Sequence, residues 1–146
     1  RRLPPSRWPV SPPGARLVVF EGWFNKVPPE HAAALATPLN ALERDEDAQG
    51  TWRGYCNEAL GRYAPLWERL DTLTWLRGPG FEVVPDWRWQ QECTLQAANP
   101  GRRAMTRAQV ERFVLFFERV SRQAQRTLPA IADETFPLDA ARRPVS

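Results

Sequence analysis

The chain has few of the residues on which metal clusters, disulfides and hydrolytic sites depend. Its 146 residues include two cysteines and one histidine. Cys56 and Cys93 lie far apart without C-x-x-C spacing, so no zinc cluster is predicted and both thiols are expected to be reduced and inert. With His31 as the single histidine, no serine or cysteine nucleophile with its histidine base can be assembled.

Long apolar runs are also absent from the sequence. No segment approaches the roughly 18 apolar residues of a membrane-spanning helix, and the first residues lack the pattern of a secretory signal. The net charge is +3 with a pI near 9.4, and Lys26 is the only lysine. Because no segment combines dense basic charge with interleaved aromatics, we do not expect nucleic acid as a partner. The lack of a spanning run and of a signal segment leads us to expect no membrane partner and a cytoplasmic location.

Aromatic and proline residues are plentiful. The hydrophobic share of 42%, with seven Trp and seven Phe, supports one globular domain over residues 1–146. Five of the 15 prolines fall within residues 1–15 and predict an extended, proline-rich arm. The opening Arg1-Arg2, with no initiator methionine, is interpreted as a chain that was cut, processed or partly presented.

An apolar run at residues 17–20 is the feature around which the fold prediction is built. Leu-Val-Val-Phe has no alternation, which favours a parallel strand buried on both faces. Glu21 would then stand at the carboxyl end of that strand, where open α/β sheets bind ligands, and Gly22 would permit a tight turn. The alternative is that Glu21 caps a helix or faces water.

The remaining elements follow from helical spacing and turn residues. A helix is predicted over 52–70, kinked or divided at Pro65, and others over 81–98 and from an N-cap at Thr106 to about residue 125. A strand at 72–76 is predicted to run parallel to 17–20, and a weak strand at 134–138 to lie at an edge or strand end. Residues 31–35 are interpreted as a short helical turn, 38–43 as another turn, and 45–47 as a solvated acidic connection.

The order of several motifs resembles the carboxyl-terminal half of the D-glycerate 3-kinase-like P-loop kinases, relatives of uridine kinase, pantothenate kinase and phosphoribulokinase. The motifs, over nearly the entire chain, are Phe20-Glu-Gly-Trp-Phe24, Pro38-Leu-Asn-Ala-Leu-Glu43, Trp52-Arg53 with Tyr55 and Asn57, Leu70-Asp71, Trp87-Arg-Trp-Gln-Gln-Glu92, Met105-Thr106, Gln109-Val110, Arg112-Phe113 and Phe117-Glu-Arg119. The resemblance implies an α/β fold: part of the three-layer P-loop kinase fold, with few parallel strands and a helix-rich carboxyl-terminal half.

The implied activity is ATP-dependent transfer of a phosphoryl group to a hydroxyl of a small, glycerate-like molecule, with ATP and Mg²⁺ as the family's cofactors. Nothing in the chain fits G-x-x-x-x-G-K-[ST], the loop that holds the nucleotide phosphates. We therefore expect this portion alone to be inactive and to bind neither cofactor tightly. Lys26 also stands where the family pattern has a glycine.

By resemblance, residues 80–128 form a lid-like helical segment whose arginines bind phosphate. Guanidinium groups suit this role because they bind phosphate oxygens through paired donors. Arg88 is assigned to catalysis, and Glu92 and Gln91 are candidates for holding the lid. The phosphate-binding lid residues would be Arg102, Arg103 and Arg107. The alternatives are that Arg88 merely pairs with Glu92 one helical turn away, and that the others are solvated.

The other implied site residues lie near the two ends of the chain. Glu21 is assigned to catalysis and to magnesium or its water shell. Substrate binding is assigned to Arg7, Gly22 and Trp23, and nucleotide binding to Arg142 and Arg143. The alternative for Trp23 is that it only packs against its neighbours. The alternative for Arg142 and Arg143 is that they are solvated at the surface.

A second interpretation is a non-catalytic relict or interaction module that keeps the α/β scaffold. In the kinase fold a missing strand would lie between the two strands predicted here. The gap would be filled by collapse, by a homodimer, or by the missing amino-terminal half.

Overall fold

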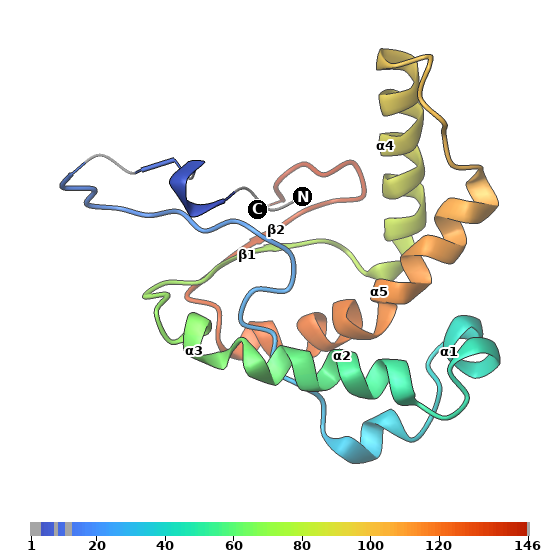
Figure 1. Ribbon diagram of the computed structural model, residues 1–146, viewed down its shortest axis with the longest axis horizontal. Helices are drawn as coiled ribbons and strands as arrows, with labels where there is room; N and C mark the ends of the chain where they lie inside the picture. Colours follow the sequence, from blue (N-terminus) through green and yellow to red (C-terminus); the bar gives the residue numbers. More distant parts are fainter. Residues whose placement is uncertain (1–3, 8, 11–12, 146) are drawn as a thin grey trace.

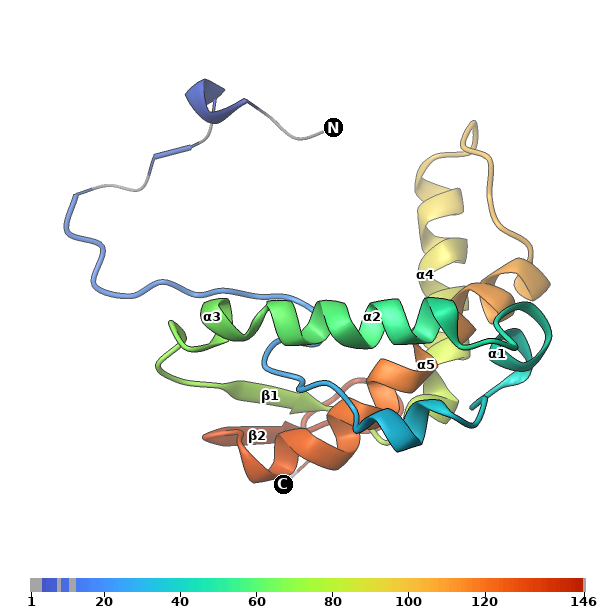
Figure 2. The same ribbon diagram turned by 60° about the horizontal axis from the view of Figure 1, so that its bottom comes forward.

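The computed structural model describes residues 4–7, 9–10 and 13–145. The proline-rich arm is therefore described only in part, and residues 1–3, 8, 11 and 12 lie outside the described residues. Within the arm, Pro5–Arg7 forms a 3-10 turn, η1, rather than a fully extended segment. Figures 1 and 2 show this segment, in blue, projecting from the body of the molecule.

Two helices replace the single one predicted over 52–70. Helix α2 spans Thr51–Arg62 and helix α3 spans Ala64–Trp67, with the break at Tyr63. The predicted effect of Pro65 is confirmed. It lies in the first turn of α3, where its missing N–H costs no helical hydrogen bond.

The carboxyl-terminal half contains the two longest helices. After a 3-10 turn, η3, at Phe81–Val83, α4 spans Val84–Ala98, and α5 spans Arg107–Thr127 before a last 3-10 turn, η4, at Leu128–Ala130. Thr106 is the N-cap of α5, as predicted. Its hydroxyl accepts from the Gln109 N–H while the Gln109 side chain accepts from the Thr106 N–H, which closes a capping box.

The two strands in the described residues are β1, Thr74–Arg77, and β2, Glu134–Pro137. They pair in parallel, with Trp75 opposite Thr135 and Leu76 opposite Phe136. Both were predicted as strands, but the ladder between them was not predicted. Residues 17–20, which were predicted to form a strand parallel to β1, form no strand.

The predicted buried strand at 17–20 is wrong. The segment has no strand hydrogen bonding, and Leu17, Val18 and Val19 are 81%, 80% and 80% exposed. Phe20 touches α3 through Trp67, with ring centroids 6.4 Å apart. Consequently Glu21 does not lie at the end of a buried strand.

The core joins the sheet to α5 and to the chain after Trp23. Val27, Leu73, Ala124 and Leu128 are its buried members. Trp75 packs against them from β1, so the core covers one face of the sheet. Figure 1 shows the strands above α2 and α5, with α4 rising away from the body.

The short helical turn predicted at 31–35 is confirmed as the 3-10 turn η2, Ala32–Leu35. The stretch after it is more helical than expected, because Ala41–Glu46 forms helix α1 where a turn and an acidic connection were predicted. The side chain of Asn40 caps α1 by accepting from the Glu43 N–H, 3.0 Å away. No described helix is both long and apolar enough to span a membrane.

Candidate functional site: an arginine-rich loop between α4 and α5

A buried carboxylate organises the loop that joins α4 to α5. Glu92, on α4, is 1% exposed. Its two oxygens accept from Arg102 at 2.8 Å, from Arg88 at 3.0 Å and from the backbone N–H of Met105 at 2.9 Å. One side chain therefore holds the middle of the loop, at Arg102, and its end, at Met105, against α4. The predicted pair of Arg88 with Glu92 is confirmed.

Electrostatics keep this carboxylate ionised. Hydrogen bonds from Arg102, from the Met105 N–H and from Arg88 outweigh the effect of burial and lower the pKa of Glu92 to about 2. The charge of Glu92 is thus fixed at neutral pH. Because both arginines are committed to it, they serve first as structural partners of the loop.

Arg103 differs from its neighbour Arg102. It is exposed and makes no ion pair within residues 4–7, 9–10 and 13–145. It borders a hollow of about 480 Å³ whose other lining includes Met105, Phe113 and Phe116. A guanidinium on the rim of an aromatic-floored hollow is suited to an anion with an apolar portion.

Arg107, at the start of α5, lies between acidic side chains. It contacts Asp86 at 2.6 Å and Glu111 at 2.7 Å, and it stacks over the ring of Trp89 at 5.9 Å. These pairs are largely exposed and therefore weak, so they leave the guanidinium able to exchange partners.

An aromatic ridge on α5 connects the loop to the segment around Glu21. Arg88 lies over Phe113 at 5.7 Å, Phe113 touches Phe117 at 5.2 Å, and Phe117 touches Trp23 edge-on at 5.7 Å. Trp23 itself is 68% exposed. One Arg88 nitrogen, Nη1, is buried without a hydrogen-bond partner among the described residues.

Glu21 stands in an extended, exposed segment and does not line the hollow beside Arg103. Gly22 lies against the Asn25 side chain, where an added Cβ would come within 3.1 Å of its Oδ1. No group of three or more potential metal ligands occurs among the described side chains. Glu21 is therefore not part of a cluster of potential metal ligands in the described part of the chain.

The remaining predicted residues are separated from the loop or engaged elsewhere. Arg7 lies in η1, on the side of the molecule opposite α4 in Figure 1. Arg142 approaches α4, donating to Gln90 Oε1 at 2.8 Å and stacking over Trp87 at 5.2 Å. Arg143 pairs with Asp139 at 2.9 Å and stays exposed.

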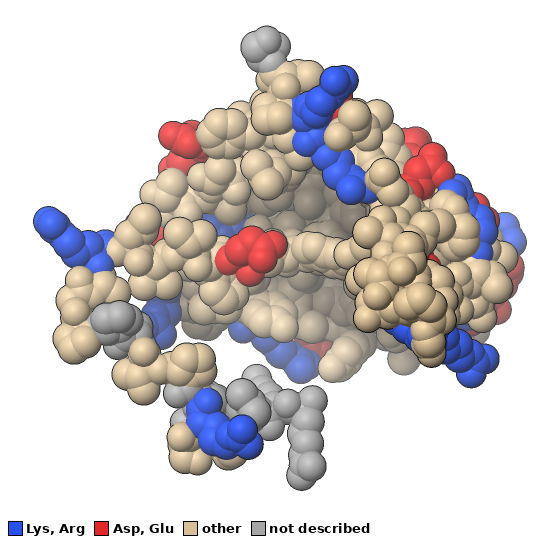
Figure 3. Space-filling view, turned by 90° about the horizontal axis from the view of Figure 1, so that it is seen from above, with Lys and Arg blue, Asp and Glu red and all other residues tan. Residues whose placement is uncertain are grey.

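Figure 3, seen from above Figure 1, shows that the face beside the projecting α4 is hollowed, with Lys and Arg side chains along part of its rim. Because Arg142 contacts Gln90 and Trp87 on α4, the carboxyl-terminal loop lies close to the same helix as the Glu92 cluster. Arginines from two chain segments thus converge on α4.

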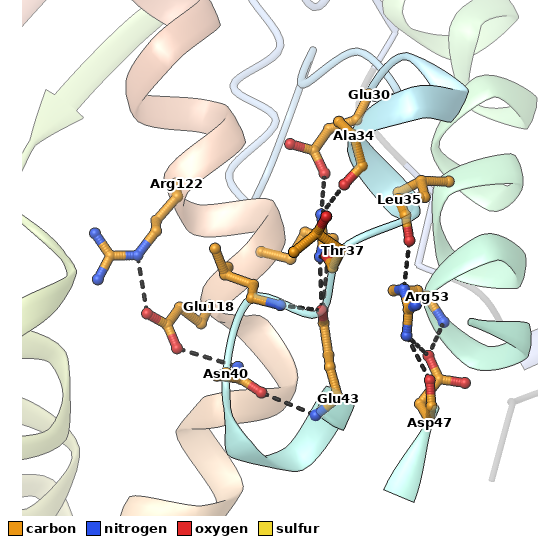
Figure 4. A network of polar contacts seen from close by, with 12 residues as sticks. Glu30, Ala34, Leu35, Thr37, Asn40, Glu43, Asp47, Arg53, Glu118 and Arg122 are labelled. Atoms are coloured by element: carbon orange, nitrogen blue, oxygen red, sulfur yellow. Dashed lines mark hydrogen bonds and ion pairs between the residues drawn. The ribbon is translucent and has the colours of Figure 1, made fainter. Parts of the chain in front are cut away.

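A second ionic cluster, which the sequence did not predict, lies on the other half of α5. Arg119 is 14% exposed and donates to Glu43 at 2.6 Å and 2.8 Å, and to Glu30 at 2.9 Å. It also donates to the carbonyls of Ala34 and Thr37. Figure 4 shows the side chains of Glu30, from the chain before α1, and Glu43, from α1 itself, turned toward one another.

The pKa of Glu43 reflects this cluster. Burial alone would raise it, but hydrogen bonds from Arg119 and from the Leu39 N–H, with the charges of Arg119 and Arg53, hold it below the ordinary value. The Asn40-x-x-Glu43 spacing is a capping-box pattern that could have revealed the start of α1. Nothing in the sequence near Glu43 indicates that its ionic partner is Arg119 on α5.

Asp47 was predicted to lie in a solvated connection, but its side chain is largely buried. Its carboxylate is 10% exposed, accepts from the backbone N–H groups of Trp52 and Arg53 at 2.9 Å and 3.1 Å, and pairs with the buried Arg53 side chain. It therefore fixes the first turn of α2. Glu46 belongs to α1 and binds Arg112 of α5, while Asp45 is exposed as predicted.

These features define an α/β chain with a small parallel sheet, a helix-rich carboxyl-terminal half and an arginine-bearing loop between its longest helices. This architecture is similar to part of the fold of a solved kinase. The solved D-glycerate 3-kinase from Cryptococcus neoformans var. grubii superposes on 87% of the chain with a TM-score of 0.64 and 23% identity.

One curated relative is similar in sequence. The uncharacterized kinase mug58 of Schizosaccharomyces pombe is 29% identical over 93 residues, which are 63% of this chain and 33% of that protein. No protein-family model matches the chain. The chain spans about half of the solved kinase, with 47% covered, and a third of the curated relative.

Proposed function

We propose that the chain is the phosphate-binding portion of an ATP-dependent kinase that phosphorylates a hydroxyl of a small, glycerate-like molecule. The proposal is based on the position of the arginine-bearing loop at 99–106. This loop lies between α4 and α5 in a chain whose fold is similar to part of a D-glycerate 3-kinase. The names of the two similar proteins agree with phosphoryl transfer.

The arginines of the loop divide into two roles. Arg88 and Arg102 are positioning residues, because both neutralise the buried Glu92. Arg103 and Arg107 bind the migrating phosphate, since the first has no ion pair among the described residues and the second has only exposed ones. Phosphoryl transfer requires mainly alignment and positive charge, which these two groups supply.

The aromatic ridge links the segment around Glu21 to the loop, and we assign this segment to the acceptor molecule. Trp23 contacts Phe117, which touches Phe113 beside Arg88, so this segment and the loop lie along one side of α5. Trp23 and Gly22 would contact the acceptor molecule there. ATP supplies the phosphoryl group when bound, and this portion alone does not turn over because its sequence contains no phosphate-cradling loop.

The test is a titration of the chain with pyrophosphate, followed by the NMR signals of the arginine side chains. We expect weak, saturable shifts confined to Arg103 and Arg107. Arg103→Gln should reduce the affinity about tenfold, the effect of one charge-assisted contact. The matched control is Arg62→Gln, an exposed arginine paired with Glu58 on α2, which should change nothing.

Two results would refute the proposal. One is equal loss of affinity in both variants, which would mean that pyrophosphate follows net charge. The other is a set of shifts centred on Arg119 and Arg126, which would move the anion site to the opposite half of α5.

A further inference from the structure

The hollow beside Arg103 has more room than a phosphate group occupies. Its volume of about 480 Å³ is in the range of pockets that hold small organic ligands. Two of its lining residues, Arg103 and Arg112, are basic, and none is acidic. The charge of the lining therefore favours an anion, and the volume leaves space for a further portion of the same ligand.

Two aromatic rings form the floor of the hollow, and contacts on α5 and α2 hold them in place. Phe116 meets Trp52 edge-on with ring centroids 5.4 Å apart, and the Arg112 guanidinium lies over the Phe116 ring at 5.4 Å. The second ring, Phe113, touches Phe117 at 5.2 Å. Rings that are already fixed lose little freedom when a ligand binds. The floor is thus a preformed surface for a flat ring.

The polar groups around the hollow are suited to an anionic group at its rim. Arg103 is exposed and makes no ion pair in the part of the chain that the structure describes. The Gln109 side chain accepts from the Thr106 N–H through its oxygen, so its amide nitrogen is the group left to donate. Arg112 pairs with Glu46, but both side chains are about half exposed, and solvent screens the pair.

We propose that this hollow binds a small organic anion that carries an aromatic ring. The ring lies on Phe113 and Phe116, and the anionic group is bound by Arg103 and Gln109. Met105 borders the same space, and its flexible thioether adapts to the shape of the ring. The site shares Arg103 with the proposed phosphate contact, so its occupant competes with phosphate. This competition rests on the proposed function, whereas binding of the ring does not.

The test uses the single methionine of the sequence as a reporter. Isotope labelling of methionine methyl groups gives an NMR signal for Met105, which lines the hollow. Phenyl phosphate should shift this signal in a saturable manner, through the ring current of the bound ring. Methyl phosphate, with the same charge and no ring, should bind about tenfold more weakly. Benzyl alcohol, with the ring and no charge, should also bind about tenfold more weakly.

Two phenylalanines provide matched variants. Phe116→Leu removes one ring of the floor but keeps an apolar side chain, so it should weaken phenyl phosphate about fivefold and leave pyrophosphate unchanged. Phe136→Leu removes a half-exposed ring on β2 that does not line the hollow, and it should change neither. Arg103→Gln, at an exposed side chain without an ion pair in the described residues, should weaken both anions without altering the melting temperature.

Several outcomes would overturn the inference. One is a Met105 signal that phenyl phosphate does not shift. Others are equal affinities for phenyl phosphate and either control compound, equal effects of the two phenylalanine variants, and binding of phenyl phosphate and pyrophosphate without competition. The proposed function fails in a different way. If phenyl phosphate binds in dependence on Phe116 but pyrophosphate does not bind, the phosphate role of the loop is refuted and this site stands.

Discussion

Replacing Arg119 by methionine tests the ionic cluster that joins α5 to the segment before α1. The substitution keeps much of the apolar stem and removes the guanidinium. Glu43 and Glu30, 4% and 7% exposed, then lose their shared partner. Breaking one side of a buried ion pair costs about 3 to 5 kcal/mol, because the remaining charge stays buried without compensation.

The lower end of that range applies here. Arg126 still pairs with Glu30, and the Leu39 N–H still donates to Glu43 at 2.7 Å. We therefore expect the free energy of unfolding to fall by about 3 kcal/mol and the melting temperature by about 6 to 12 °C. Urea unfolding followed by circular dichroism measures the first quantity.

The effect should depend on pH in a defined direction. The pKa of Glu43 is lowered in the folded chain, so its stabilising contribution is present above the unfolded pKa and is lost as pH falls through the folded one. The difference between wild type and Arg119→Met should be full at pH 7. It should shrink as the pH falls below about 4 and the Glu43 carboxylate becomes protonated.

The matched control lies on the same helix. Arg112 pairs with Glu46, and both side chains are about half exposed, at 52% and 53%. Arg112→Met should cost at most about 1 kcal/mol, because solvent screens the pair. Equal destabilisation by the two variants, or a difference that persists unchanged at pH 3, would refute the reasoning.

Substitutions at three further positions test other parts of the structure. Glu92→Leu should raise amide exchange at Met105 about tenfold or more, and wild-type protection there should persist as pH falls from 5 and disappear toward 2, because the Glu92 pKa is lowered to about 2. Lys26 has a left-handed φ of 58° but donates to the Leu70 carbonyl at 2.7 Å, so Lys26→Met should cost about 1 kcal/mol and Lys26→Gly less, in paired thermal melts. Thr106→Ala should lower the unfolding free energy by about 1 kcal/mol through loss of the capping box, and an unchanged chemical midpoint would contradict it.

Local signals were sufficient to predict most of the helices. Spacing by threes and fours, the N-cap at Thr106 and the break near Pro65 act within a few residues, so the sequence contains the information directly. The pairing of Arg88 with Glu92 is predictable for the same reason, since the two lie one helical turn apart.

Strand pairing and buried ion pairs could not be predicted in this way. Residues 17–20 have the pattern of a covered strand, but the pattern does not say what covers them, and β1 pairs instead with β2, some 60 residues later. Arg119 meets Glu43 and Glu30 across 76 and 89 residues. The position of Lys26 was informative, because its left-handed backbone is one that glycine adopts at no steric cost.

The proposed function requires that the loop between α4 and α5 contacts the phosphates of a nucleotide. A photoreactive ATP analogue with an azidoanilide on the γ-phosphate, followed by peptide mapping, tests this most directly. Adducts should concentrate between Arg103 and Arg107 and be displaced by pyrophosphate. Adducts concentrated instead around Arg119 and Arg126, or spread evenly over the surface arginines, would contradict the claim.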